Sequence, residues 1–336
     1  MKLLTVTVPC YNSQDYMEKC VNSLLTGGDR VQIVIIDDGS KDATGEISDR
    51  YGEKYPDIVT VVHQENGGHG EGINQGLAHA TGTYFKIVDS DDWVSSDFCG
   101  FLDTLEQCEK CGGVDLFVTN YYYEHADGKG NRSICYANAL PEDRIFGWEE
   151  TSRFQMHQLL TIHSCTFRTA VLRENTRLLP KHVFYEDNLM VYQGLPFVSR
   201  LYYKNIDLYR YFIGRDGQSV QRDVMTRRYQ HQIIVTQRCF EACHLDEIAQ
   251  KKLRTYLKHE LFMMFGISAL YARLNKSAEA EENLNKMWEA CEAFDPKWAK
   301  HFRKHSPLSI ICIPGKTGQR ISGAVYTVAN KVVRFN

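Results

Sequence analysis

Short apolar runs alternate with amphipathic stretches over the first 120 residues of the chain. The apolar, β-branched runs predict strands, and the stretches with apolar residues every three or four positions predict helices. The predicted strands are residues 3–9, 31–36, 58–64, 84–88 and 114–120, and the predicted helices lie near residues 17–25, 42–55, 70–80 and 96–111. This alternation predicts an α/β fold with a doubly wound, mainly parallel sheet, in which the carboxyl ends of the strands share one edge.

The regular alternation ends after residue 120. Residues 121–150 predict a polar loop or hairpin, residues 151–220 mix short strands and helices, and residues 227–305 have a helical pattern. Residues 307–336 are punctuated by glycine and proline and end in a β-branched stretch. We therefore expect an α/β domain over residues 1–220 and a helical C-terminal extension with a basic tail over residues 221–336.

The composition describes a globular chain with an uneven charge. Of the 336 residues 43% are hydrophobic, and no apolar run reaches the roughly 18 residues of a membrane span. The first residues are expected to form a strand and not a secretion signal. The formal net charge of −3 argues against a nucleic-acid partner, and eleven scattered cysteines fit a reducing cytoplasm.

The basic tail stands apart from this acidic body. Eight lysines and arginines and no acid follow Asp295. Such a tail predicts peripheral contact with an anionic membrane, or equally docking on the acidic body of the protein itself.

Two of the predicted strands end in groups of aspartates. Asp37-Asp38 follows residues 31–36, and Asp89-Ser90-Asp91-Asp92 follows residues 84–88. Carboxylates this close raise each other's pKa unless a cation or strong donors lie among them. Acids at strand ends are also suitable ligands for Mg²⁺ or Mn²⁺ bound to a phosphate, whereas the simpler explanation is two Asp-rich turns.

These residues closely resemble the family 2 glycosyltransferases with the GT-A fold. The similarity covers residues 1–115 in order and spacing, and it returns at Phe184-Tyr185-Glu186-Asp187. It is carried by Thr5–Asn12, Ile36–Asp42, Asn66-Gly67-Gly68, Ala80–Tyr84 and Asp89–Asp92. The resemblance implies an inverting, metal-dependent transferase of bacterial surface polysaccharide synthesis.

On the donor side, the resemblance implies a UDP-sugar and Mn²⁺ or Mg²⁺. Asp89 and Asp91 would hold the metal and the sugar nucleotide, with Asp91 the direct ligand and Asp92 a second candidate for a sugar or helix-cap contact. The base pocket would be formed by Pro9, Tyr11 and Asp38, with Asp37 as the alternative to Asp38.

On the acceptor side, the resemblance implies that Asp187 is the general base and that Glu186 orients the acceptor. The acceptor would be a glycan or a lipid-linked sugar, which places the enzyme in the cytoplasm or at the inner face of the cell membrane. A carboxylate within hydrogen-bond reach of a hydroxyl can take its proton as the new bond forms.

Several positions depart from the family pattern or leave alternatives open. Family members often have an arginine where this chain has Ile73, so His69 beside the flexible Gly68 is a candidate donor contact, or else a loop histidine. Arg215 could pair with phosphate, although a solvated loop arginine is the simpler interpretation. His163 and His182 are candidate acceptor contacts or structural residues.

Two other functions are compatible with the sequence. A nucleotidyltransferase that activates sugar phosphates would need a basic, glycine-rich loop after the first strand, and residues 9–13 contain no basic residue. A non-catalytic, transferase-like scaffold would not need the intact acids at residues 89–92 and 186–187.

Overall fold

One twisted sheet organises the N-terminal part of the protein. The computed structural model describes residues 2–214, 218, 221–306, 309, 311, 313 and 315–333. The strands lie in the order β3-β2-β1-β4-β9-β6-β10-β5, with β7 beside β6 and β8 beside β10. Their bounds are β1 (Leu4–Cys10), β2 (Val31–Asp37), β3 (Val59–His63), β4 (Tyr84–Ile87), β5 (Trp93–Val94), β6 (Leu116–His125), β7 (Arg132–Ile134), β8 (Ile145–Phe146), β9 (Cys165–Arg168) and β10 (Leu201–Ile213).

The half of the sheet from β3 to β4 is parallel, as the sequence predicts. Its crossover helices are α1 (Met17–Leu25), α2 (Thr44–Lys54) and α3 (His69–His79), and α4 (Phe98–Lys110) follows the short β5. Every residue of β1 and β2 is buried, which matches strands covered on both faces. The predicted α/β fold with a mainly parallel sheet is confirmed in this half.

The other half of the sheet contains pairings that the sequence did not reveal. β9 lies antiparallel between β4 and β6, and it is followed by α5 (Thr169–Asn175) and α6 (Glu186–Gly194). β10 runs parallel to β6, and this partner extends β6 to His125, beyond the predicted end at residue 120. The predicted hairpin of residues 121–150 is present where β7 pairs with the end of β6.

Helix α3 packs closely on β1 through glycines. A Cβ atom at Gly72 would lie 3.0 Å from Cβ of Pro9, and one at Gly76 would lie 1.9 Å from Oγ1 of Thr7. Only glycine permits this separation, because any side chain at residue 76 would overlap the threonine. The close packing fixes the start of α3 beside the carboxyl edge of the sheet.

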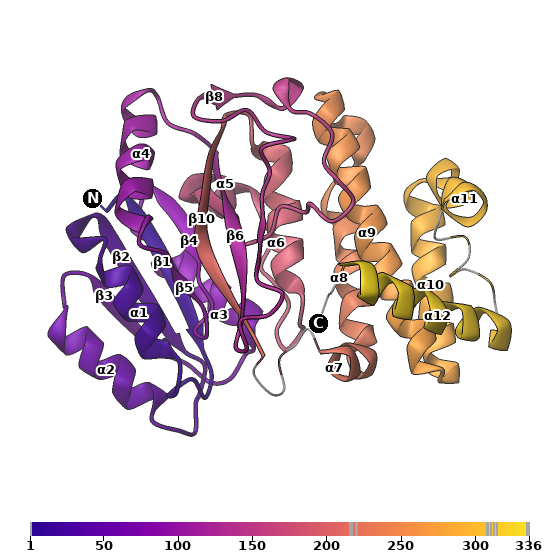
Figure 1. Ribbon diagram of the computed structural model, residues 1–336, viewed down its shortest axis with the longest axis horizontal. Coiled ribbons are helices and arrows are strands. Elements are labelled where there is room, and N and C mark those ends of the chain that lie inside the picture. Colours follow the sequence, from indigo (N-terminus) through magenta and orange to yellow (C-terminus); the bar gives the residue numbers. More distant parts are fainter. Residues whose placement is uncertain are drawn as a thin grey trace. The chain divides into compact units, whose positions relative to one another are not determined.

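Contacts divide the chain into two compact units, Met1–Gly214 with Gln250–Leu253, and Arg215–Ala249 with Arg254–Asn336. The domain boundary expected after residue 220 stays a prediction. Helices make up the second unit in the described residues, in orange to yellow in Figure 1. They are α7 (Arg222–Arg227), α8 (Tyr229–Ala242), α9 (Lys251–Asn275), α10 (Ala278–Phe294), α11 (Pro296–His305) and α12 (Gly315–Val333). Helix α12 was not evident from its glycine- and proline-punctuated sequence. In the described part of the chain, the helices are too short or too polar to span a bilayer.

Candidate active site

The carboxyl ends of β1, β2 and β4 meet at one edge of the sheet. β1 pairs in parallel with both neighbours, with Cys10 opposite Asp37 and Thr7 opposite Ile87. The aspartates at the end of β2 and those that follow β4 therefore lie at the same edge of the sheet. This shared edge is the one expected from the sequence, and in open α/β sheets it is where ligands bind.

Asp38 is buried and holds the glycine-rich turn that leads into α3. Its Oδ1 accepts hydrogen bonds from Nε2 of Gln64 at 2.6 Å and from the backbone N–H of Gly67 at 2.7 Å. Its Oδ2 accepts from the backbone N–H of Gly68 at 2.8 Å. Both oxygens thus support the turn, so the recognition of a base by Asp38 stays a prediction.

The other residues predicted for the base pocket lie around the same edge. Oδ1 of Asp37 accepts from the backbone N–H of Ser40, and Oδ2 lies 3.0 Å from Nδ1 of His63. Burial opposes the ionisation of Asp37, but these hydrogen bonds hold its pKa below the usual value. Pro9 is buried in β1, whereas Tyr11 is 51% exposed and leaves its ring available for stacking.

The acids after β4 are fixed by β10. Asp92 is buried, and its Oδ2 accepts from the hydroxyl of Tyr209 at 2.5 Å while its Oδ1 accepts from the backbone N–H of Phe212 at 2.7 Å. The same hydroxyl oxygen accepts from the backbone N–H of Asp89 at 3.2 Å. Burial and the charges of Asp91 and Asp89 raise the pKa of Asp92 well above its usual value. Asp92 therefore supports the loop, and its contact with a sugar or a helix cap stays a prediction.

His69 joins acids from two distant parts of the chain. As the first residue of α3, it lies with Nδ1 2.8 Å from Oε1 of Glu186 and Nε2 3.0 Å from Oδ1 of Asp89. Burial opposes a charge on the ring, but the two hydrogen bonds prevail and raise the pKa of His69 well above its usual value. A neutral imidazole can donate only one of these bonds, whereas an imidazolium can donate both.

Glu186 and Asp187 begin helix α6, where the helix dipole favours negative charge. The preceding Tyr185 has a left-handed backbone with φ of 70°, which turns the chain sharply into the helix. Glu186 is 1% exposed. Burial and the charge of Glu186 raise the pKa of Asp187 to about 7, a value suited to a general base near neutral pH.

A buried lysine lies beneath this edge of the sheet. Lys86 of β4 is 1% exposed, and its Nζ donates to the backbone oxygens of Ile162 at 3.5 Å, His163 at 2.9 Å and Cys165 at 3.3 Å. Burial lowers the pKa of Lys86 to about 8. A lysine within an otherwise apolar strand is visible in the sequence, although it belongs to none of the motifs.

His163 faces the acids from the loop that Lys86 holds. Its ring lies against those of Tyr209 and Tyr211, with centroids 4.6 and 4.7 Å away. Burial lowers the pKa of His163 to about 4, so the ring is neutral. Within the described residues, its buried Nδ1 has no hydrogen-bond partner. His163 belongs to none of the sequence motifs, so its role was open from the sequence alone.

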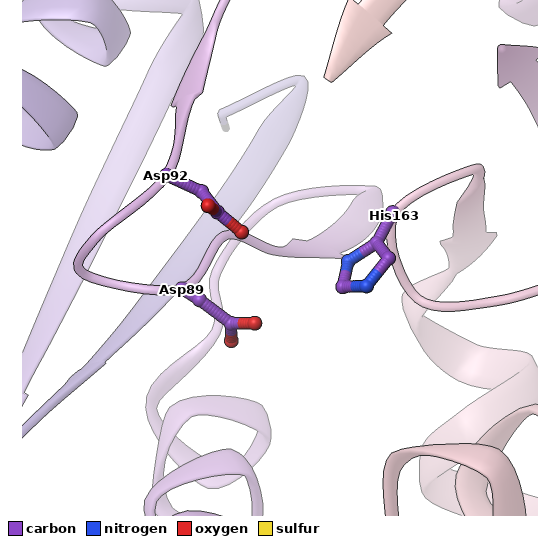
Figure 2. Close-up of side chains that lie close together, drawn as sticks. All are labelled: Asp89, Asp92 and His163. Atoms are coloured by element: carbon purple, nitrogen blue, oxygen red, sulfur yellow. The ribbon is translucent and has the colours of Figure 1, made fainter. Parts of the chain in front are cut away.

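Asp89, Asp92 and His163 together form a group that fits a divalent cation. Figure 2 shows the imidazole directed toward the two carboxylates, and one possible ligand atom from each residue lies within 4.8 Å of the others. Carboxylate oxygens suit Mg²⁺ and Mn²⁺, and an imidazole nitrogen is a further ligand suited to transition metals. The predicted pair was Asp89 with Asp91, and Asp91 does not belong to this group, so its role as the direct ligand stays a prediction.

The sequence also suggested two further residues, Arg215 and His182. Arg215 lies outside the described residues. His182 has a left-handed backbone and donates its N–H to the carbonyl of Gly67 at 2.8 Å, so its main chain supports the glycine turn.

Comparisons with known sequences point to the glycosyltransferases. The sequence profile described as "Glycosyl transferase family 2" matches residues 5–170. Glycosyltransferase GlyA of Streptococcus pneumoniae serotype 4 is 28% identical over 241 residues, which are 69% of this chain and 33% of GlyA.

Two solved structures share the fold. The crystal structure of S. aureus TarS residues 1–349 in complex with UDP-GlcNAc is similar over 97% of this chain and 92% of that one, with a TM-score of 0.70 and 18% identity. The mannosyltransferase PcManGT from Pyrobaculum calidifontis, in complex with GDP-Man and Mn²⁺, is similar over 97% of this chain and 86% of that one, with a TM-score of 0.52 and 19% identity.

The chain matches only part of the length of its curated relatives. The chain spans between 33% and 60% of the first curated relatives that it matches. The matched region nevertheless contains β1 to β9, the aspartates after β2 and β4, and the glycine turn before α3. Residues 5–170 belong to glycosyl transferase family 2, and the chain has a GT-A-like fold.

Proposed function

We propose that this protein transfers a sugar from a nucleotide donor, with a UDP-sugar as the first candidate, to a glycan or lipid-linked acceptor in bacterial surface polysaccharide synthesis. The observation that carries the proposal is the convergence of acids from separate elements at the carboxyl edge of the sheet. Asp89 follows β4, Glu186 and Asp187 begin α6, and His69 lies within hydrogen-bond distance of both Asp89 and Glu186.

The donor occupies the side of the edge formed by β1, β2 and the 64–68 turn. Tyr11 stacks on the base, and Asp37 or Asp38 accepts a hydrogen bond from it. Asp89 and Asp91 would hold Mn²⁺ or Mg²⁺, and Asp92 and His163 lie close enough to Asp89 to contribute ligands. When bound, the cation supplies positive charge that neutralises the departing diphosphate.

The acceptor hydroxyl approaches from the side of α6. Asp187 takes the hydroxyl proton while the acceptor oxygen bonds to the anomeric carbon and the bond from that carbon to the diphosphate breaks. Attack opposite the leaving group inverts the anomeric carbon. The elevated pKa of Asp187, about 7, makes it a stronger base than an ordinary aspartate.

A panel of nucleotide sugars tests the proposal. UDP-GlcNAc, UDP-glucose and GDP-mannose are incubated with the protein and MnCl₂, and release of the nucleotide by slow hydrolysis is measured, together with calorimetric binding. We expect one donor to bind and be hydrolysed, with activity lost in EDTA and in Asp91→Ala but kept in the exposed control Asp57→Ala. Full activity in EDTA or in Asp91→Ala would overturn the metal assignment. Absence of both binding and hydrolysis would overturn the function.

We also propose that the protein works in the cytoplasm and that its basic tail contacts the inner face of the membrane. The exposed face of α11 carries Lys297, Lys300, Arg303 and Lys304, while Ala299 and Phe302 on its other side are buried. Each basic residue near an anionic surface adds about 1 kcal/mol. Changing the three lysines to glutamine should weaken co-sedimentation with phosphatidylglycerol vesicles, and uncharged vesicles serve as the control. Equal sedimentation of the variant and the natural protein would contradict this role.

A further inference from the structure

We propose that His69 is a positioning residue that sets the distance between the donor half and the acceptor half of the site. It does so by joining Asp89, after β4, to Glu186, at the start of α6. The inference rests on the proposed transferase function, which defines the two halves. It assigns to His69 a role different from the direct contact with the donor that the sequence suggested.

Both ring nitrogens of His69 are already used. Nδ1 lies 2.8 Å from Oε1 of Glu186, and Nε2 lies 3.0 Å from Oδ1 of Asp89. A histidine that bound the diphosphate would need one nitrogen directed at the ligand. Here each nitrogen meets a carboxylate, so the contribution of His69 to the site is the placement of those acids.

The backbone around His69 is built to bring these parts together. The 179–186 segment lies against α3, because Leu179 and Asn74 exchange two hydrogen bonds. Gly70 leaves the space that Glu186 occupies, since a Cβ atom there would lie 2.8 Å from Cγ of Glu186 and 3.0 Å from the carbonyl oxygen of Pro180. His69 is thus a side-chain link between α3 and the 179–186 segment, and Gly70 allows these two parts to lie close together.

The two ends of the link differ in their other support. Asp89 is also held through its backbone N–H, which donates to the hydroxyl of Tyr209. Glu186 begins α6 and is followed directly by Asp187, so a displacement of Glu186 moves the proposed base with it. Loss of the link should therefore reduce turnover more than it reduces binding of the donor.

Two variants break the link in different ways. His69→Gln removes one of the two ring contacts, and Gly70→Ala forces Glu186 away without changing a charged group. The matched controls are His79→Gln at the other end of α3 and Gly100→Ala in α4, where an added Cβ meets nothing within 4 Å. Hydrolysis of the best donor from the panel gives kcat and KM, and calorimetry with UDP and MnCl₂ gives Kd.

We expect kcat to fall ten- to a hundredfold in His69→Gln and in Gly70→Ala, with Kd for UDP changed less than threefold and both controls unchanged. The fall is expected because a hydrogen bond of the link is lost and, with it, the geometry of the base. Equal losses in kcat and in UDP affinity would mean that His69 contacts the donor directly. An unchanged kcat in both variants would mean that His69 has no role in turnover. Either result overturns the proposal.

A double-mutant cycle tests whether His69 acts through Glu186. If it does, His69→Gln should lower kcat little further in a Glu186→Gln background, whereas independent effects would multiply and overturn the proposal. The same cycle measured by the midpoint of urea unfolding needs no substrate. If the protein hydrolyses no nucleotide sugar, the proposed function fails, but coupled midpoint shifts still support the link and additive shifts still refute it.

Discussion

The pKa of Asp187 allows a quantitative test of its role as the general base. Burial and the neighbouring charge of Glu186 raise the pKa of Asp187 from the usual 3.8 to about 7. A protonated carboxyl cannot accept the proton of an attacking hydroxyl, so activity should be lost as the pH falls through 7. With a pKa of 7 the ionised fraction is about a tenth at pH 6 and about nine tenths at pH 8, which predicts a roughly tenfold rise in rate over this range.

The assay is metal-dependent hydrolysis of the best donor from the panel, followed as kcat/KM between pH 5.5 and 8.5, because this ratio reports the ionisation of the free enzyme. An ordinary aspartate would already be ionised at pH 6 and would give a flat profile. Glu186→Gln removes a nearby negative charge, so its profile should move to lower pH. Asp187→Asn should lose turnover far more than donor binding. A flat profile for the natural protein, or an unchanged kcat in Asp187→Asn, would refute the reasoning.

Two further substitutions test the packing around the site. Gly76→Ala places a Cβ atom 1.9 Å from Oγ1 of Thr7 and should lower the free energy of unfolding by about 1–3 kcal/mol in urea titrations, whereas Gly100→Ala, which meets nothing within 4 Å, should not be destabilising. If Gly76→Ala had the same urea midpoint as the natural protein, that result would contradict the close approach of α3 to β1. Tyr209→Phe removes the hydroxyl that donates to Asp92 and leaves a buried acceptor without this donor, at a cost of about 1–3 kcal/mol in the same titration. An unaltered midpoint would mean that Asp92 does not depend on that hydroxyl.

The parallel half of the fold was predictable because its signals are local. Strands such as Val31–Asp37 are apolar runs of the correct length, and the helix after each one has a clear apolar face. Predicted and observed ends differ by a few residues at most. The same locality placed both groups of aspartates at one edge, since parallel strands with crossover helices leave no other arrangement.

The antiparallel half depends on partners far apart in the chain. The sequence of β10, Leu201–Ile213, mixes aromatic, charged and apolar residues, and only its pairing with β6 makes it a long strand. Likewise, His69 and Glu186 are separated by 117 residues, so their contact has no local pattern. Motifs therefore indicated which residues belong to the site but not which of them bind one another, and the individual roles stay predictions.

Helix α3 links the integrity of the site to the folding of the whole sheet. Three of its eleven residues are glycines, and each disfavours an isolated helix by about 1 kcal/mol relative to alanine. A helix of this length and composition would be largely unfolded by itself, so it owes its structure to its packing on β1. His69 therefore lies on a helix whose folding depends on the sheet. Local unfolding of α3 would break the contacts of His69 with Asp89 and with Glu186 together, so the link between the two halves of the site depends on the folding of the sheet.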